Sequence, residues 1–331
     1  MESKDTFKIA IIGTGWIAEK MAITICGMQG VEKYAIASRH LSKAQAFAEK
    51  YEFTRAYGSY EEMLDDEQVQ LVYIATPHSF HYEHARLCIM KGKPVLCEKA
   101  FTATAPQAEK LLSLAKEKKV FITEAIWTRY MPLSKTINEV IASGVIGVPS
   151  MLSANLGYPV GWKERMTKPE LAGGALLDLG VYCINFALMV FGTDIKKTLS
   201  VCTKTATGVD AEESITFLFN DGKIAVLHSS MYAKTDRQGI ISGDRGHLIV
   251  ENINNPQRIS VVTGDYEVVA QYDCPPQITG YEYQVYACIE ALKNGWLESP
   301  CMPHAETLRI MRLMDSLRKE WGVHYPFDEK I

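Results

Sequence analysis

The sequence predicts an α/β protein: a doubly wound parallel sheet, followed by an α+β domain with a large, mostly antiparallel open sheet. Between Phe7 and about Glu124, short apolar segments alternate with helical patterns, and such repeated strand–helix units form parallel sheets. A Gly-rich turn at residues 13–15 joins the first strand to the first helix. Beyond Tyr130, several strand-like segments follow one another at hairpin spacing, which indicates an antiparallel sheet.

Length and composition favour a globular protein of two domains. The chain has 331 residues, and we expect the domains at residues 1–125 and 126–331. Hydrophobic residues make up 47% of the chain and charged residues 22%, which is enough to bury sizeable cores. The net charge of −4 provides no electrostatic footprint for nucleic acid, so we expect no such partner.

The apolar runs and the cysteines indicate in which cellular compartment we expect the protein. The longest apolar run, residues 176–191, is interrupted by Asp178 and Asn185, so we expect no membrane span. The polar residues 1–8 are too short a segment for a signal peptide. The eight cysteines are scattered without a Cys-x-x-Cys pair, which is typical of reduced thiols, and we expect a cytoplasmic protein.

The first strand and the turn after it predict a dinucleotide site. Residues 9–12 read as a buried strand, and Gly13 opens the pattern G-x-G-x-x-A, which ends at Ala18. The first glycine allows the tight turn, the second lets the backbone approach a pyrophosphate, and the helix N-terminus offers N–H groups to the anion. A plain strand–helix turn is the alternative. The expected phosphate-binding residues are Gly13, Thr14, Gly15, Trp16 and Ile17.

Further elements of the first domain follow from apolar runs and caps. We expect strands at residues 34–37, 71–75, 94–98 and 120–124, with helices between them. Ser42, Ser59 and Thr104 are the expected helix caps, the last two in capping boxes. In such a sheet ligands bind at the carboxyl ends of the strands. The residues at those ends are the expected cofactor contacts: Ser38, Arg39, Thr76, Pro77, His78, Glu98, Lys99, Trp127 and Arg129.

The end of the second strand indicates which cofactor binds. An NAD site usually has Asp or Glu there, whereas this chain reads Ala37-Ser38-Arg39-His40. A hydroxyl and a guanidinium suit a 2′-phosphate, so we expect NADP, with NAD as the alternative. The other reading of Arg39 is a solvated surface charge.

Three motifs carry a resemblance to a known family: Glu98-Lys99-Ala100, the run EAIWTRY at residues 124–130, and the run GGALLDLGVY at residues 173–182. On these motifs the chain resembles the Gfo/Idh/MocA oxidoreductases over essentially its whole length. The most similar branch contains the dimeric dihydrodiol dehydrogenases and NADP-dependent D-xylose dehydrogenases. The family's E-K-P motif maps onto residues 98–100, with Ala100 in place of the proline. The D-x-x-x-H motif maps onto Asp178 and Tyr182, and this tyrosine occurs in the named branch.

The resemblance implies roles for several residues. Lys99, Tyr182 and Asp178 would be catalytic, and His78 and His81 would border the cofactor. Oxidation of an alcohol requires loss of the hydroxyl proton, and a lysine cation beside a tyrosine favours its phenolate form. Residues 173–191 read as a helix, which places Asp178 and Tyr182 one turn apart on one face, where both would also bind substrate. The irregular segment 157–172 is either a lid that carries Trp162 and Arg165 to the substrate or a surface loop.

The second half of the chain predicts the α+β domain. We expect strands at residues 150–156, 198–203, 214–219, 223–228, 247–251 and 258–263, and helices at 133–143, 281–293 and 304–321. Asp221-Gly222 is a strong hairpin signal between two of the strands. In the family such a sheet commonly forms the subunit interface, which implies a homodimer or a dimer of dimers.

Taken together, these features predict an NADP(H)-dependent oxidoreductase. The expected substrate is a secondary alcohol or lactol of a sugar, polyol or cyclic diol, such as a D-xylose-type aldose or a trans-dihydrodiol. A non-catalytic NADP-binding sensor and an NAD-dependent glycosidase of the same fold are the alternatives. His78, His81 and His84 are spaced along one helix start but lack a supporting ligand pattern, so we expect no metal.

Overall fold

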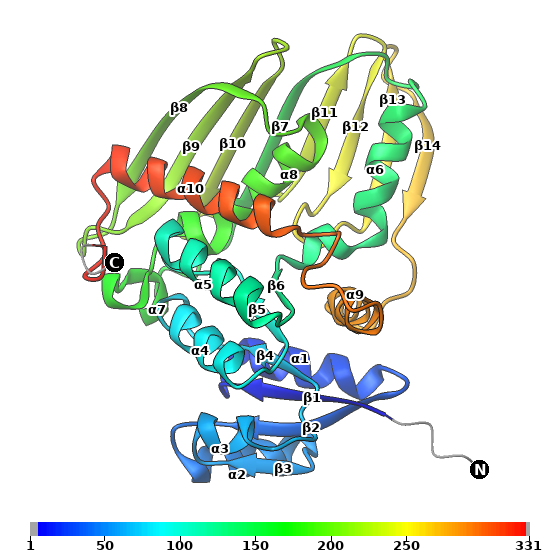
Figure 1. The fold of residues 1–331 in the computed structure, drawn as a ribbon. Coiled ribbons are helices and arrows are strands. Elements are labelled where there is room, and N and C mark those ends of the chain that lie inside the picture. The colour runs from blue at the N-terminus through cyan, green and yellow to red at the C-terminus, as the bar shows by residue number, and fades with distance from the viewer. Residues whose placement is uncertain (1–5, 329–331) are drawn as a thin grey trace. The chain divides into compact units, whose positions relative to one another are not determined.

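The computed structural model describes residues 6–328 and divides into two units (Figure 1). Unit 1 comprises residues 6–126 and Gln277–Met311, and unit 2 comprises Trp127–Pro276 and residues 312–328. The expected contiguous division differs from this in one segment, because residues 277–311 pack with the first unit. The physical reason is that Val285, Cys288 and Ile289 of this segment belong to the apolar core of unit 1.

Unit 1 is built on a six-stranded sheet whose described strands all pair in parallel. The strand order is β3-β2-β1-β4-β5-β6, so the chain order reverses between β1 and β4. This confirms the doubly wound sheet, and in sheets of this kind ligands generally bind at the switch point. The strands are β1 (Phe7–Ile12), β2 (Val31–Ala37), β3 (Arg55–Tyr57), β4 (Leu71–Ile74), β5 (Val95–Glu98) and β6 (Ile122–Ala125).

The helices of unit 1 begin largely where their caps predict. Ser59 accepts a hydrogen bond from the N–H of Glu62, and Thr104 accepts one from the N–H of Gln107. Ser42 is not a cap: the helix begins at Leu41 after His40, so Ser42 lies in its first turn. The helices are α1 (Trp16–Gly27), α2 (Leu41–Tyr51), α3 (Tyr60–Leu64), α4 (His78–Met90), α5 (Ala105–Lys118) and α9 (Glu282–Lys293).

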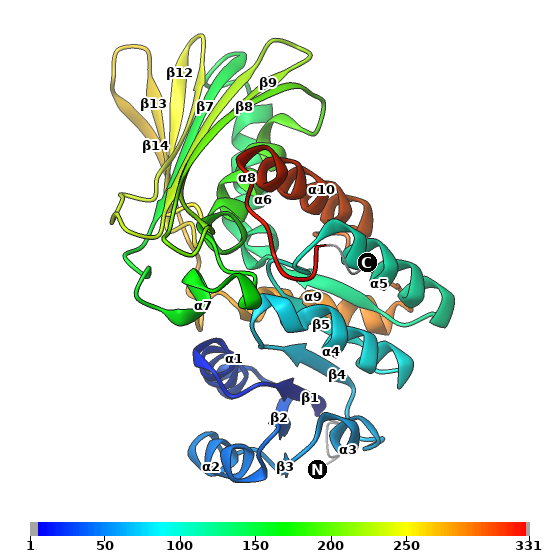
Figure 2. The same ribbon diagram turned by 90° about the vertical axis from the view of Figure 1, so that its left-hand side faces the viewer.

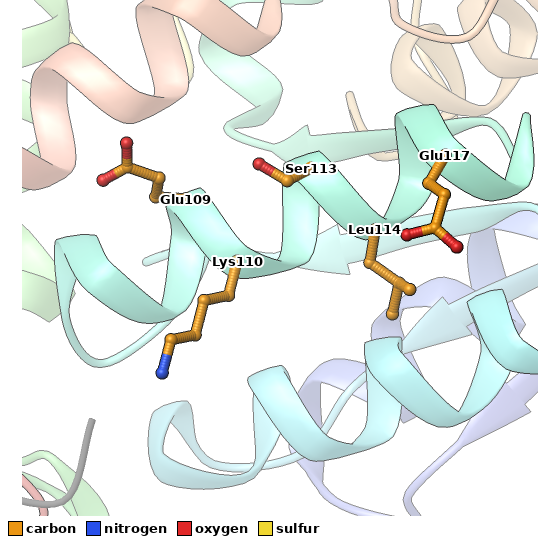
Figure 3. Close-up of a pocket in the computed structure, with 5 residues that line it drawn as sticks. All are labelled: Glu109, Lys110, Ser113, Leu114 and Glu117. Atoms are coloured by element: carbon orange, nitrogen blue, oxygen red, sulfur yellow. The ribbon is translucent and has the colours of Figure 1, made fainter.

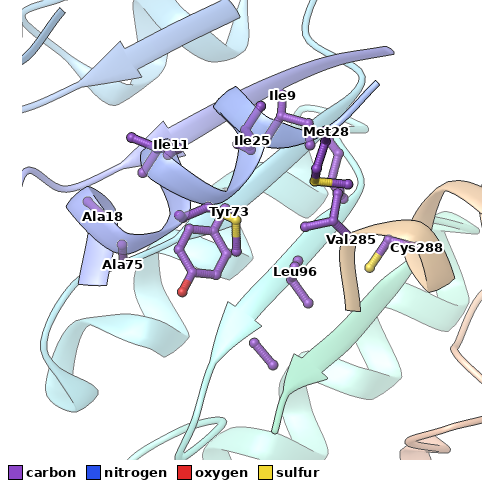
Figure 4. Packing of buried hydrophobic residues seen from close by; sticks show 14 of the residues in the cluster. Ile9, Ile11, Ala18, Ile25, Met28, Tyr73, Ala75, Leu96, Val285 and Cys288 are labelled. Atoms are coloured by element: carbon purple, nitrogen blue, oxygen red, sulfur yellow. The ribbon is translucent and has the colours of Figure 1, made fainter. Parts of the chain in front are cut away.

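The core of unit 1 joins the sheet to α1 and α9 (Figure 4). Ile9 and Tyr73 from two neighbouring strands are each 1% exposed and pack with Ile25 of α1. Val285 and Cys288 come from α9 and are 1% and 0% exposed. Burying each such side chain stabilises the fold by about 1.5–3 kcal/mol, which fixes α9 to this unit although it is distant in sequence.

Unit 2 is built on an eight-stranded sheet in the order β14-β13-β12-β11-β7-β10-β9-β8. β7 and β10 run parallel, and the other described strand pairs of this sheet are antiparallel, which confirms the mostly antiparallel sheet. The hairpin predicted at Asp221-Gly222 joins β9 to β10, with Gly222 at φ 87°. The strands are β7 (Pro149–Gly157), β8 (Ile195–Lys204), β9 (Asp210–Phe219), β10 (Ile224–Ser230), β11 (Gly239–Gly243), β12 (Gly246–Glu251), β13 (Arg258–Thr263) and β14 (Val268–Asp273).

Helices cover one face of this sheet. α6 (Pro132–Ala142) and α8 (Val181–Phe191) lie on the same side of it in both views (Figures 1 and 2). The residues of α10 (His304–Trp321) are shared between the units: those up to Met311 belong to unit 1 and the rest to unit 2. Residues 173–191 are not one α-helix as expected, because the π-helical segment η3 (Leu176–Gly180) precedes α8. The short elements are η1 (Trp127–Tyr130), α7 (Glu164–Thr167) and η2 (Pro169–Leu171).

One helical stretch is long and apolar enough to cross a membrane by length and composition. It is Pro169–Phe191, and 89% of its most apolar window is buried inside the protein itself. The buried helix α8, in the core of unit 2, accounts for this apolar character.

Candidate functional site

The turn after β1 has the geometry of a phosphate-binding loop. Gly13 adopts φ +106°, and a Cβ added there would lie 2.7 Å from the carbonyl oxygen of Ala75. Gly15 is the N-cap of α1, and a Cβ built on it would meet no atom within 4 Å. The backbone at the start of α1 therefore has open space in front of it. A pyrophosphate fits such a glycine-lined helix N-terminus.

The end of β2 lies against this loop and carries no acid. The N–H of Gly13 donates to the carbonyl oxygen of Ala37 at 3.1 Å. Ser38 is 8% exposed, and its Oγ accepts from the N–H of His40 at 3.4 Å. Arg39 is exposed, and its guanidinium carbon lies 5.7 Å from the ring centre of Phe80. The residues present fit a phosphorylated ribose better than a free one, because a cation stands where an acid would be needed.

The ends of β4 and β5 meet through a buried histidine. The ring nitrogens of His81 lie 2.8 Å from the carbonyl oxygens of Thr76 and Ala100. Burial lowers the pKa of His81, and the two carbonyl oxygens oppose this effect in part. His81 thus links the segment of Thr76, Pro77 and His78 to the segment of Lys99. Because a Cβ on Gly13 would also lie 3.2 Å from Thr76, the structure brings the predicted strand ends of unit 1 together.

Two buried carboxylates hold the backbone around Lys99. Glu98 accepts from the phenol of Tyr73 and from the N–H of Lys99, the latter at 3.3 Å. Glu124 accepts from the N–H of Phe101 at 3.1 Å. The peptide bond that follows Lys99 is cis. Sequence reasoning missed Tyr73 and the role of Glu124, because their contacts join residues 25 and 23 positions apart.

In unit 2 the residues after β6 contact α8. The indole N–H of Trp127 donates to the phenol oxygen of Tyr182 at 2.9 Å, and both side chains are buried. The Nε of Arg129 donates to the side-chain oxygen of Asn185 at 2.5 Å. The structure therefore brings Trp127 and Arg129, predicted as cofactor contacts, to the helix that carries the predicted catalytic tyrosine.

Asp178 forms a bidentate ion pair with Arg165, which lies in the segment predicted as either a lid or a surface loop. The guanidinium of Arg165 donates to both carboxylate oxygens of Asp178, at 2.9 and 3.1 Å. Asp178 is 7% exposed and lies in the π-helical segment η3, a geometry frequent at functional sites. Trp162 is 80% exposed, and the amine of Lys163 lies 5.5 Å from the centre of its ring.

Two further buried acids, Asp210 and Glu213, lie beside η3. Asp210 accepts from the N–H of Leu176 at 2.6 Å, and burial raises the pKa of Asp210 to about 6. Burial also raises the pKa of Glu213, which accepts a hydrogen bond from the hydroxyl of Ser229. A Cβ on Gly180 would lie 2.5 Å from Glu213, so the glycine makes room for this carboxyl. Sequence reasoning missed both acids; glycines within an apolar helical run were the only signal.

The described part of the chain offers no further obvious centre. Within residues 6–328, no group of three or more His, Cys, Asp or Glu side chains could hold a metal ion. A surface hollow runs along α5 (Figure 3), and its lining residues all come from that helix: Glu109, Lys110, Ser113, Leu114 and Glu117. It contains none of the predicted site residues.

Comparison with known families accounts for most of the chain. Residues 7–125 match the family model described as "Oxidoreductase family, NAD-binding Rossmann fold". Residues 134–249 match the model described as "GFO/IDH/MocA C-terminal domain".

Curated relatives extend the match to nearly the full length. A trans-1,2-dihydrobenzene-1,2-diol dehydrogenase of Mus musculus is 32% identical over 333 residues, which covers 97% of this chain and 98% of that protein. A D-xylose 1-dehydrogenase (NADP(+)) of Hypocrea jecorina is 34% identical over 368 residues, covering 97% of this chain and 93% of the relative.

Solved structures share the fold. A 3-ketoreductase from Actinomadura kijaniata, in complex with NADP and TDP-benzene, superposes with a TM-score of 0.85 at 24% identity, covering 95% of this chain and 97% of that one. An aldose–aldose oxidoreductase from Caulobacter crescentus gives 0.86 at 20% identity, with 96% and 98% covered.

Proposed function

The chain belongs to the Gfo/Idh/MocA oxidoreductase family, and on this premise we propose that it is an NADP-dependent dehydrogenase or reductase acting on CH–OH groups. The observation that carries the proposal is the similarity, over 97% of this chain, to two dehydrogenases at 32% and 34% identity, one of them named with NADP(+). The residues that match the family's catalytic motif, Lys99, Asp178 and Tyr182, are all present in this chain.

We propose NADP as the cofactor, with NAD as the weaker ligand. The Gly13 loop would hold the pyrophosphate, and the Ser38 hydroxyl and Arg39 guanidinium would hold a 2′-phosphate. The name of the Hypocrea jecorina relative includes NADP(+), which supports this choice. A bound nicotinamide cofactor supplies the acceptor or donor of a hydride.

The chain itself has to move the proton and orient the substrate. We propose Tyr182 as the group that takes the hydroxyl proton during oxidation, and Lys99 as the cation that favours its phenolate form. The hydrogen bond from Trp127 to the phenol oxygen supports this role, because such a donor stabilises a phenolate. Asp178, held by Arg165, would orient the substrate hydroxyl.

The proposed substrates are small sugars, polyols or cyclic diols. This class rests on the named relatives, which include a dihydrodiol dehydrogenase and a D-xylose dehydrogenase. A non-catalytic NADP-binding sensor would lack turnover, and an NAD-dependent glycosidase would release a leaving group without net cofactor reduction. The presence of Lys99, Asp178 and Tyr182 favours the dehydrogenase over the sensor.

A substrate panel tests the proposal. The purified protein is incubated with NADP and a series of aldoses, polyols and trans-dihydrodiols, and the appearance of NADPH is followed by absorbance. We expect turnover with at least one substrate class and none without substrate. Absence of turnover in the whole panel, in both the oxidising and the reducing direction, would contradict the proposed activity.

We also propose a homodimer, or a dimer of dimers, that assembles through the large sheet. One row of cross-strand neighbours lies on the less buried face of the sheet: Leu199, Thr216, Val226, Ser153, Ile240 and Ile249. Leu199 is 55% and the nearby Val201 68% exposed in the single chain. Partner binding would remove this apolar surface from water.

We propose a cytoplasmic location. The eight cysteines are scattered along the sequence without a Cys-x-x-Cys pair, which supports a reducing compartment.

A further inference from the structure

The ring of Phe80 lies beside Arg39, the predicted cofactor contact that follows β2. Phe80 belongs to the first turn of α4, and Arg39 follows β2, so the two are far apart in sequence. The guanidinium carbon of Arg39 stands 5.7 Å from the ring centre of Phe80, within range for a cation–π interaction. Within residues 6–328, no carboxylate forms an ion pair with Arg39.

We propose that Phe80 is a positioning residue for cofactor specificity: its ring holds the Arg39 guanidinium where it can bind the 2′-phosphate of NADP. This inference rests on the proposed NADP dependence and adds a residue to it. An exposed arginine loses side-chain entropy when it is ordered, at a cost of up to about 2 kcal/mol. A ring that orders the guanidinium before the phosphate arrives reduces that cost at the moment of binding.

The position of the Phe80 ring is restricted by His84, which in turn contacts Tyr60 and Thr76. His84, one turn further along α4, stacks on it with ring centres 5.8 Å apart and planes 16° apart. The ring centres of His84 and Tyr60 lie 4.7 Å apart with their planes at 72°, and the Nδ1 of His84 lies 3.0 Å from the hydroxyl oxygen of Thr76. Three contacts therefore hold His84, and His84 in turn limits the positions that Phe80 can adopt.

The charge state of His84 suits this arrangement. Burial lowers the pKa of His84 to about 4, with smaller contributions from His81 and Arg39. At neutral pH the imidazole is therefore uncharged. His84 therefore does not place a second cation near Arg39 and the Phe80 ring, whose face carries partial negative charge.

The test compares two ligands that differ only in the 2′-phosphate: 2′,5′-ADP and 5′-AMP. Their dissociation constants are measured by titration calorimetry on the native protein and on Phe80→Leu, which removes the ring but keeps an apolar side chain. We expect Phe80→Leu to weaken 2′,5′-ADP about two- to five-fold, the usual worth of an exposed cation–π contact, and to leave 5′-AMP unchanged. Phe80→Tyr keeps the ring face and should retain the native ratio of the two constants.

Two further variants separate positioning from loss of structure. In an Arg39→Ala background, Phe80→Leu should have no additional effect on 2′,5′-ADP, because the ring acts through the guanidinium. Phe47→Leu removes a ring with two aromatic neighbours in the same unit but no contact to Arg39, and it should leave the ratio unchanged.

The outcomes distinguish this inference from the function on which it rests. Equal affinity of the native protein for 2′,5′-ADP and 5′-AMP would contradict the proposed NADP preference. Native preference for 2′,5′-ADP that survives intact in Phe80→Leu would overturn the role of Phe80 alone. Equal weakening of both ligands in Phe80→Leu, or the same change in Phe47→Leu, would also overturn it, because the effect would then not concern the phosphate.

Discussion

The phenol of Tyr182 is buried, yet its oxygen accepts a hydrogen bond from the indole of Trp127 at 2.9 Å. Arg165 holds Asp178, the other residue of the same motif, by two hydrogen bonds. Both side chains are therefore fixed by donors from outside their own helix. Preorganised polar groups of this kind contribute to catalysis because they need not reorganise during the reaction.

The first prediction concerns Tyr182→Phe. This change removes the proton acceptor with little change in shape, so the rate should fall about 10²–10⁴-fold, the usual worth of positioned acid–base catalysis. NADP affinity, measured by calorimetry, should stay native because the Gly13 loop and Arg39 are untouched. Tyr272→Phe, on the exposed edge strand β14, is the matched control. Near-native turnover by Tyr182→Phe would exclude Tyr182 as the proton acceptor.

Lys99→Met gives a second prediction for the same chemistry. It should lower the rate at least as much as Tyr182→Phe, since it removes both the cation that favours phenolate and a donor to the substrate oxygen. The double variant should be little slower than the slower single variant, because the two residues act as a unit. Additive losses in kcat/KM would show that they act independently.

Arg39→Asp tests whether the charge of this side chain determines the preference for NADP over NAD. The substitution puts an acid at the end of β2, where it can bind ribose hydroxyls and repel a 2′-phosphate. We expect NADP binding to weaken about ten- to hundred-fold, as for loss of a charge-assisted hydrogen bond. The KM values for NADP and NAD, measured side by side, should approach each other or cross. An unchanged preference for NADP over NAD would show that Arg39 is a solvated surface charge and does not bind the cofactor.

At the scale of elements, η3 depends on an acid at its start. Asp210 accepts from the N–H of Leu176, and Gly174 adopts φ +131° beside the same carboxyl. A Cβ on Gly174 would lie 2.3 Å from Asp210, so only glycine leaves room for this contact. The carboxyl thus fixes the start of η3, which carries Asp178 and leads into α8 with Tyr182.

The pKa of Asp210, raised from 3.8 to about 6 by burial, makes stability depend on pH. For an acid whose folded pKa is raised, the stabilisation is complete below the unfolded pKa and is lost as pH rises through the folded one. Asp210→Asn does not ionise, so its free energy of unfolding relative to the native protein should increase between about pH 4 and pH 7. Denaturant titrations at these two values measure the difference.

Asp221→Asn is the control of opposite sign. The Lys223 ammonium beside Asp221 lowers the pKa of that carboxyl, so its stabilisation is present above the unfolded pKa and lost as pH falls. The relative stability of this variant should therefore not increase with pH. A pH-independent difference between Asp210→Asn and the native protein would contradict the buried, raised carboxyl.

Local patterns predicted most elements because local rules govern them. The cap at Ser59 and the hairpin at Asp221-Gly222 each depend on residues only a few positions apart. β11 and β14 were not predicted: β11 is a five-residue strand bounded by glycines, and β14 is an edge strand that is mostly exposed. Neither has the apolar alternation that reveals a half-buried strand.

The candidate site could be proposed from sequence where it follows a motif, but not where it depends on contacts between residues far apart in the chain. The Gly13 turn and the residues at strand ends follow from the strand–helix pattern alone. The ring of Phe80, the carboxyl of Asp210 and the packing of α9 in unit 1 depend on tertiary contacts. Ser42 was misjudged as a cap because the helix begins one residue before it.

At the scale of the whole molecule, the proposed dimer predicts the effect of a charge in the sheet. Val226 lies in the centre of the cross-strand row, beside Thr216 and Ser153. Val226→Lys should shift the protein toward the monomer in light scattering, because a buried, unpaired ammonium destabilises an interface. Val145→Lys, at an exposed valine outside the sheet, should leave the mass unchanged. A native protein that is monomeric at micromolar concentration would contradict the proposed assembly.

The central claim is that hydride passes between a substrate carbon and NADP. It is tested most directly with a substrate from the panel that carries deuterium on the carbon bearing the hydroxyl group. After incubation with NADP, mass spectrometry of the cofactor should show NADPH that contains the deuterium, and Tyr182→Phe should form it far more slowly. Reduced cofactor without deuterium, or release of a leaving group with the cofactor unchanged, would contradict the account.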